Sequence, residues 1–193
     1  MARLVLFQSV TLDGVMQAPG RPDEDPRGGF PYGGWAAPYA DQEMGKAAGE
    51  SVATTGGLLL GRRTYEDFFS IWPNQKDNPF TEVLNNTQKF VASTTLSEPL
   101  PWMNSTLLKG DVSQAVAELK TRLDKDLVLL GSGELVQTLM KHNLIDLYIL
   151  LIHPLILGTG SRLFREGASL SKLQPTDSRM TSTGVLIATY QHP

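Results

Sequence analysis

The chain of 193 residues contains no cysteine. This absence excludes a disulfide framework, a catalytic thiolate and cysteine metal ligands, and it is consistent with the cytoplasmic location that we expect. The histidines at His142, His153 and His192 are widely separated, and no acidic cluster accompanies them. We therefore expect no metal site.

A basic excess is missing too, because 17 Lys and Arg residues stand against 20 Asp and Glu residues. The chain thus lacks the electrostatic signature of nucleic-acid binding, and a small-molecule partner is favoured. The apolar run within residues 1–10 is too short for a membrane span or a signal peptide, so we expect no membrane partner. The chain length predicts one domain over residues 1–193.

What the sequence does contain is most informative between residues 126 and 164. Residues 127–130 predict a strand covered on both faces, and residues 145–157 predict a longer strand. Between them a glycine turn precedes a helix with apolar residues at helical spacing, namely Leu135, Val136, Leu139 and Met140. A strand end followed by small residues and a helix start exposes backbone N–H groups that can bind a phosphate. The alternative is a tight turn without a ligand.

The rest of the chain alternates between strand patterns and helix patterns. Strands are expected at residues 4–10, 57–61, 89–94 and 105–109. Helices are expected at residues 41–52, 65–72 and 112–123, with a further helical turn at 80–86. Residues 172–183 and 184–191 predict antiparallel strands. Together these elements predict an α/β fold with a mostly parallel central sheet, antiparallel C-terminal edge strands and flanking helices.

Small or cationic residues follow three of the predicted strands. The groups are Gly61-Arg62-Arg63-Thr64, Ser93-Thr94 and Gly131-Ser132-Gly133-Glu134. Open α/β sheets bind ligands outside the carboxyl ends of their strands. The last group is not a Rossmann fingerprint, because Val136 stands where the third glycine would be.

Several motifs together resemble the dihydrofolate-reductase-like reductases. The motifs are TLDG, GRRTYEDF, LGSGELV and IHPLILGTGSRLF. They look most like the group that includes the C-terminal reductase domain of the bifunctional riboflavin-biosynthesis deaminase/reductase. The resemblance covers most of the chain and implies NADPH bound across the strand ends, a small-molecule substrate and a homodimer.

The resemblance also implies cofactor-binding residues. They form a first phosphate-binding turn, an adenosine side and a pyrophosphate turn: Gly61, Arg62, Arg63, Thr64, Ser93, Thr94, Gly131, Ser132, Gly133, Glu134, Leu135 and Val136. Independently, an arginine fork suits the 2′-phosphate that separates NADPH from NADH. The alternative interpretation of Arg62 and Arg63 is a solvated helix start.

Four residues are candidates for substrate binding or catalysis. Trp35 and Asp41 are similar to the tryptophan loop and the pterin-binding acid of dihydrofolate reductases, and the alternative interpretation of Asp41 is the N-cap of the following helix. His153 could donate a proton or contact the substrate, or be a structural residue. Asp13 could orient the substrate or the nicotinamide, or belong to an ordinary turn.

These features predict an NADPH-dependent reductase that transfers hydride to a small heterocyclic, imine or carbonyl substrate beneath the loop of residues 17–38. In the riboflavin-pathway domain an acidic residue precedes the glycine turn. Leu130 stands there instead, so we expect little turnover of that pathway's pyrimidine intermediate. The alternatives are a dihydrofolate or riboflavin-pathway reductase and a nucleotide-binding or sensing module without turnover.

Overall fold

The computed structural model describes residues 1–75, 78–168 and 170–193. Its strands are β1 Leu4–Thr11, β2 Gly57–Gly61, β3 Lys89–Ala92, β4 Ser105–Leu108, β5 Leu127–Leu130, β6 Leu147–His153, β7 Gln174–Met180 and β8 Leu186–Gln191. They form one sheet in the order β4-β3-β2-β5-β1-β6-β8-β7. Strands β1 to β6 pair in parallel, whereas β8 runs antiparallel to both β6 and β7. The predicted mostly parallel sheet with an antiparallel edge is confirmed.

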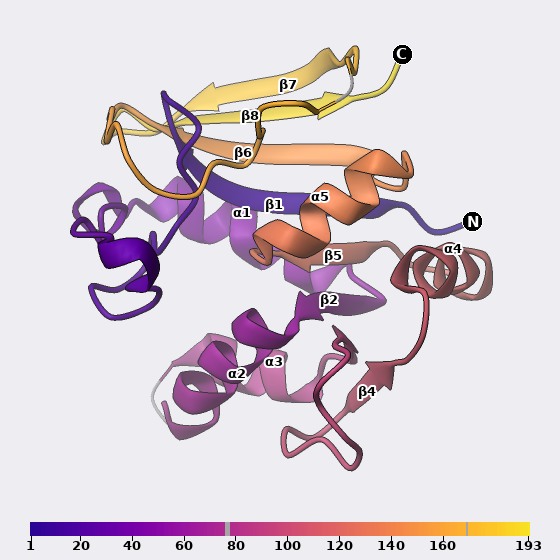
Figure 1. The fold of residues 1–193 in the computed structure, drawn as a ribbon. Coiled ribbons are helices and arrows are strands. Elements are labelled where there is room, and N and C mark those ends of the chain that lie inside the picture. The colour runs from indigo at the N-terminus through magenta and orange to yellow at the C-terminus, as the bar shows by residue number, and fades with distance from the viewer. Residues whose placement is uncertain (76–77, 169) are drawn as a thin grey trace.

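The α-helices of the described part are α1 Gln42–Ala53, α2 Arg62–Ile71, α3 Pro79–Asn86, α4 Val112–Arg122 and α5 Gly133–Lys141. Figure 1 shows α4 and α5 on one face of the sheet and α1 on the other. None of the described helices is long and apolar enough to span a membrane.

Both faces of the central strands are buried, which explains why their sequences are continuously apolar. Leu59 and Leu129 pack with the apolar faces of α4 and α5. Their neighbours Leu58 and Val128 point to the other face and join side chains from α1, α2 and α3. Successive strand residues alternate between the two faces, so each strand contributes to two cores.

Several expected strands end earlier than predicted, among them β4 at Leu108 and β7 at Met180, and for β6 and β3 the cause is local. β6 stops at His153 because the next residue, Pro154, has no N–H to donate to a neighbouring strand. β3 stops at Ala92 because the hydroxyl of Ser93 accepts the backbone N–H groups of Thr95 and Leu96 and closes a turn. In both cases the residue just after the strand, Pro154 or Ser93, ends it even though the following residues have a high β propensity.

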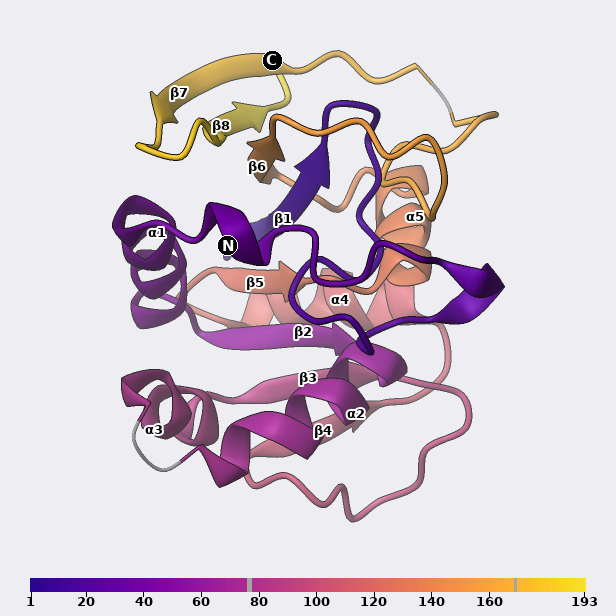
Figure 2. The same ribbon diagram turned by 90° about the vertical axis from the view of Figure 1, so that its left-hand side faces the viewer.

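The loop of residues 17–38 is held to the body of the protein by Gln17. Its backbone carbonyl accepts the indole N–H of Trp35 at 2.7 Å. Its side-chain amide donates to the carbonyls of Asp25 and Arg27, each at 3.0 Å, and accepts the N–H of Ser161 at 2.9 Å. Figure 2 shows the segment after β1 beside the carboxyl ends of β5 and β2. The loop therefore forms a wall beside the strand ends.

Candidate active site

A cleft of about 730 Å³ lies where the 17–38 loop meets the carboxyl ends of the parallel strands. The last residues of β2, β3 and β5, which are Gly61, Ala92 and Leu130, all line it. Its volume is typical of small-molecule sites, which measure roughly 300–1,000 Å³. Its position is also the one at which open α/β sheets bind ligands.

Helices α2 and α5 both begin at this cleft. Gly61 is the N-cap of α2 and Ser132 is the N-cap of α5, and neither helix has a side-chain hydrogen bond that caps it. The first backbone N–H groups of a helix have no partner within the helix, and the helix dipole makes this end positive. The two helix starts thus provide donors for an anion such as a phosphate.

A network of short contacts joins the two helix starts. The Gly61 N–H donates to the Ser132 hydroxyl at 2.8 Å, and that hydroxyl donates to the Thr64 hydroxyl at 2.8 Å. A Cβ atom on Gly61 would lie 3.0 Å from the Ser132 side chain. Gly131 has a φ of +55°, and a Cβ there would lie 3.1 Å from the Thr64 hydroxyl. A Cβ atom at either position would therefore crowd its neighbour across the junction, and at Gly131 the left-handed backbone also favours glycine.

The cleft also holds arginines with different partners. Arg165 pairs with Glu134 at 2.6 Å, and this contact holds the pKa of the Glu134 carboxyl below its ordinary value. Arg27 pairs with Asp25. Arg62 and Arg63 are exposed at the cleft and make no ion pair within the described part of the chain. These two guanidinium groups, with the uncapped helix starts, fit the phosphates of a dinucleotide.

The structure brings eleven of the twelve predicted cofactor residues to the cleft, and Val136 is fully buried beneath it. Those that line it are Gly61, Arg62, Arg63, Thr64, Ser93, Thr94, Gly131, Ser132, Gly133, Glu134 and Leu135. Three separate turns of the sequence therefore meet at one surface.

Asp13 does not line the cleft. Its carboxylate accepts the Thr11 hydroxyl at 2.6 Å and the backbone N–H groups of Leu157 and Gly158 at 3.2 and 2.9 Å. The hydrogen bond from Thr11, followed by those from the backbone, lowers the pKa of Asp13 to about 2. In this position Asp13 ties the turn after β1 to the chain after β6.

Asp41 also lies outside the cleft, and it caps α1. Its carboxylate accepts the N–H of Glu43 at 2.7 Å and the N–H and hydroxyl of Ser182. The Ser182 hydroxyl is the main cause that lowers the pKa of Asp41. Asp13 and Asp41 are therefore shifted in the opposite direction to that required of a proton donor near neutral pH.

Trp35 and His153 lie together, but neither lines the cleft. Their ring centroids are 5.0 Å apart in an edge-to-face arrangement, and His153 is fully buried. Its Nδ1 lies 3.0 Å from the carbonyl oxygen of Leu151, so Nδ1 carries the proton. Burial lowers the pKa of His153. The roles of Trp35 and His153 in substrate binding stay predictions, since no contact in the cleft involves them.

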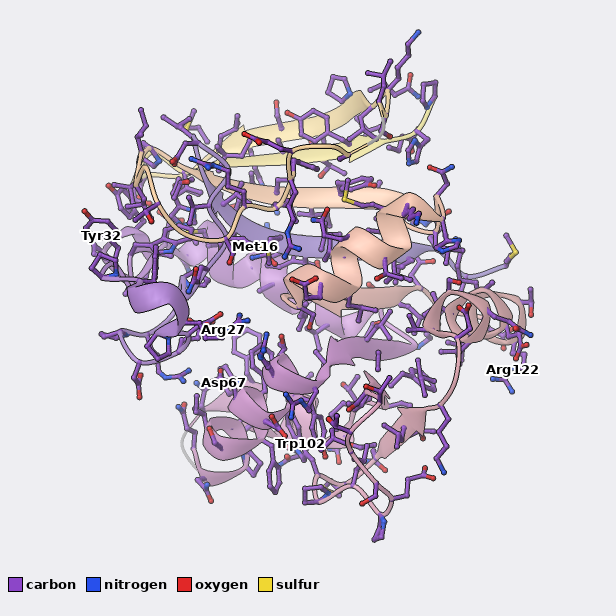
Figure 3. The ribbon with its side chains drawn as sticks, viewed as in Figure 1. Met16, Arg27, Tyr32, Asp67, Trp102 and Arg122 are labelled. Carbon is purple, nitrogen blue, oxygen red and sulfur yellow. The ribbon has the colours of Figure 1, made fainter. Side chains whose placement is uncertain are left out.

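The sequence interpretation missed the acidic wall of the cleft. Glu24 and Asp25 from the loop and Asp67 from α2 line it. Figure 3 shows Arg27 on the loop side and Asp67 on the neighbouring helix. The signal was the charged run RPDEDPR within the Pro/Gly-rich segment, which is unusual for a simple connecting loop.

Comparison with known proteins gives consistent relatives. The RibD C-terminal domain family matches residues 2–187. The uncharacterized protein YyaP of Bacillus subtilis (strain 168) is 27% identical over 194 residues, which cover 97% of this chain and 94% of that protein. A putative riboflavin biosynthesis protein from Shewanella sp. PV-4 is 23% identical, with a TM-score of 0.70 and coverage of 100% of this chain and 99% of the other.

The fold extends to a more distant group. A dihydrofolate reductase from Enterococcus faecalis, complexed with NADP(H) and RAB-propyl, is 15% identical with a TM-score of 0.58. The match covers 98% of this chain and 96% of that one. The expected dihydrofolate-reductase-like fold is confirmed.

Proposed function

The chain belongs to the RibD C-terminal domain family, and on this premise we propose that it is an NADPH-dependent reductase acting on a small heterocyclic, imine or carbonyl substrate. One observation carries the cofactor assignment. Among the described residues, two helix starts without a side-chain cap and two arginines without an ion pair, Arg62 and Arg63, open into the same cleft. This combination of donors suits a dinucleotide with an additional phosphate.

Different residues of the cleft would bind different parts of the cofactor. The first N–H groups of α5, beside the Gly131 turn, would bind the pyrophosphate, and Arg62 and Arg63 would bind the 2′-phosphate. Ser93 and Thr94 would contact the adenosine side. A bound nicotinamide would supply the hydride.

The apolar part of the cleft is the proposed place for the substrate. Phe7 from β1, Phe68 from α2 and Leu130 at the end of β5 line it. An aromatic and aliphatic wall with a few polar groups is typical of sites that hold a flat heterocycle. Because the cleft is open and not filled by side chains, turnover is favoured over a binding module that has lost its chemistry.

Calorimetric titration with NADPH and with NADH tests the proposal. We expect measurable binding of both and tighter binding of NADPH, since only NADPH offers a 2′-phosphate to the arginines. Failure of the protein to bind either cofactor would reject the proposed function.

A further inference from the structure

Glu24 has a geometry that a purely structural carboxylate does not need. Its Oε2 accepts the backbone N–H groups of Gly20 and Arg21 at 2.6 and 3.1 Å. Within the described part of the chain, Oε1 has no hydrogen-bond partner, and the residue lines the cleft. One oxygen is thus anchored to the loop while the other is available to a ligand.

Among the described residues, no lysine or arginine forms an ion pair with Glu24. The guanidinium of Arg21 is committed to Asp67 on α2, at 2.6 and 3.3 Å, and approaches Asp23 at 3.4 Å. This pair fastens the loop to the helix directly beside Glu24. Burial raises the pKa of the Glu24 carboxyl, and the charge of Asp67 raises it further, against the opposing effects of the two N–H groups and Arg21.

We propose that Glu24 is a catalytic residue that donates the proton to the substrate during reduction, with the Arg21 and Asp67 pair as its positioning residues. The inference deepens the proposed function and rests on it. Asp13 and Asp41 have lowered pKa values and lie outside the cleft, whereas Glu24 lies inside it with an accessible oxygen. A half-buried carboxyl group that lines a cleft is a suitable general acid, because burial favours its protonated form.

The chemistry balances with one proton from Glu24. The carbon of a substrate C=N or C=O bond accepts the hydride from the reduced nicotinamide and forms a C–H bond. The π electron pair moves to nitrogen or oxygen, which takes the proton from the Glu24 carboxyl to form N–H or O–H. The substrate is reduced, the nicotinamide is oxidised, and the Glu24 carboxylate regains a proton from water.

The first test requires no substrate. We would label the glutamate side chains with ¹³C, assign the Glu24 carboxyl signal by its loss in Glu24→Gln, and follow it with pH by NMR. A proton donor should titrate above the ordinary glutamate value near 4.5. A carboxylate that only accepts N–H groups should titrate below it, because those hydrogen bonds favour the charged form. A pKa at or below the ordinary value would overturn the inference.

The second test uses variants in NADPH oxidation assays with dihydrofolate, pterins, quinones and small carbonyls. Glu24→Gln retains an oxygen that can accept the Gly20 and Arg21 N–H groups, so the loop should keep its shape. We expect unchanged NADPH affinity and a fall in kcat of about 10²–10⁴-fold for any substrate that the unchanged protein turns over. If Glu24 is the proton donor, kcat of the unchanged protein should fall as the pH rises through the pKa of Glu24. This fall should be absent in Glu24→Gln.

Glu66→Gln is the matched control, because Glu66 is an exposed glutamate on α2 that makes no ion pair among the described residues and does not line the cleft. Its kcat and pH profile should stay unchanged. If Glu24→Gln binds NADPH and retains both full turnover and the pH profile, the inference alone is overturned. If the unchanged protein binds no nicotinamide cofactor, the proposed function is overturned and the inference with it.

Discussion

The backbone N–H of Gly61 donates to the hydroxyl of Ser132 at 2.8 Å, although 71 positions separate them in the chain. This single contact aligns the start of α2 with the start of α5. Ser132 itself has a φ of 64°, an uncommon conformation for a residue with a side chain. Such conformations persist where the surrounding structure enforces them, and they often mark functional sites.

Gly131→Ala should damage this junction. The left-handed backbone costs a residue with a Cβ about 1–2 kcal/mol, and the added atom would press on the Thr64 hydroxyl at 3.1 Å. We expect a lower Tm and weaker NADPH binding by calorimetry. Gly45→Ala is the control, because Gly45 is in α1 with open space around its Cβ position. That change should raise stability by roughly 0.5–1 kcal/mol, and equal effects of the two substitutions would contradict this account.

Arg62→Ala and Arg63→Ala should reduce the preference for NADPH over NADH. Loss of one hydrogen bond to a charged group costs about 1.5–3 kcal/mol, so NADPH affinity should fall by at least tenfold while NADH affinity changes little. Calorimetry with both cofactors measures this. Arg122→Ala provides the control, since Arg122 lies on α4 away from the cleft, as Figure 3 shows. An unchanged preference in both variants would show that these arginines do not bind the 2′-phosphate.

The riboflavin-pathway pyrimidine intermediate should be a poor substrate. Leu130 lines the cleft at the end of β5, and its side chain cannot accept a hydrogen bond from a ribityl or ribosyl hydroxyl as a carboxylate could. Loss of a buried hydrogen bond to a substrate hydroxyl can reduce the preference for that substrate over others by orders of magnitude. NADPH oxidation followed by absorbance, with this intermediate beside dihydrofolate and small carbonyls, is the measurement. Rapid turnover of the intermediate would remove the argument from Leu130.

Asp13→Asn should destabilise the protein at neutral pH. The folded pKa of Asp13 is lowered to about 2 from an ordinary 3.8, so its contribution is present above pH 3.8 and is lost as the pH falls towards 2. After allowance for its partial exposure, we expect a loss of roughly 1–2 kcal/mol in urea unfolding at pH 7.

The difference between the unchanged protein and Asp13→Asn should narrow as the pH falls from 4 to 2. Asp124→Asn is the control, because Asp124 is exposed and makes no ion pair among the described residues. A difference that is independent of pH would argue against the ionised Asp13 carboxylate as its source.

We also predict a homodimer, on the family resemblance. The apolar sequence of β6 does not itself indicate an interface, because β6 is paired on both sides, by β1 and by β8. Burial within one chain explains its sequence. Light scattering at micromolar concentration should give about twice the 21.1 kDa of the chain. A mass equal to that of one chain would reject the dimer.

Most of the fold could be predicted because each element has a local cause. The apolar run at Leu127–Leu130 became β5 with the same bounds, and Asp111 caps α4 by accepting the N–H groups of Ser113 and Gln114. The turns at residues 61–64 and 131–134 could be predicted for the same reason, because each directly follows a predicted strand in the sequence.

The acidic wall could not be predicted in this way. Glu24 faces the cleft only because Gln17 and the Arg21 to Asp67 pair fix the loop against α2. These contacts join positions that are distant in sequence, so the local pattern of apolar residues cannot predict them. The surroundings of His153 could not be predicted from the sequence either, because the rings of Trp35 and Tyr39 that pack against it come from a distant part of the chain.

The placement of β1 at the centre of the sheet has a consequence for synthesis of the chain. Its pairing partners are β5 and β6, and the ion pair beside it joins Arg3 to Asp126, 123 positions later. A ribosome-bound chain that has not yet reached β5 therefore exposes β1 and one side of β2 without partners. Such long-range pairing slows folding and leaves apolar strand edges open to aggregation. Premature termination anywhere before residue 127 should yield an insoluble fragment that requires chaperones, not a smaller folded unit.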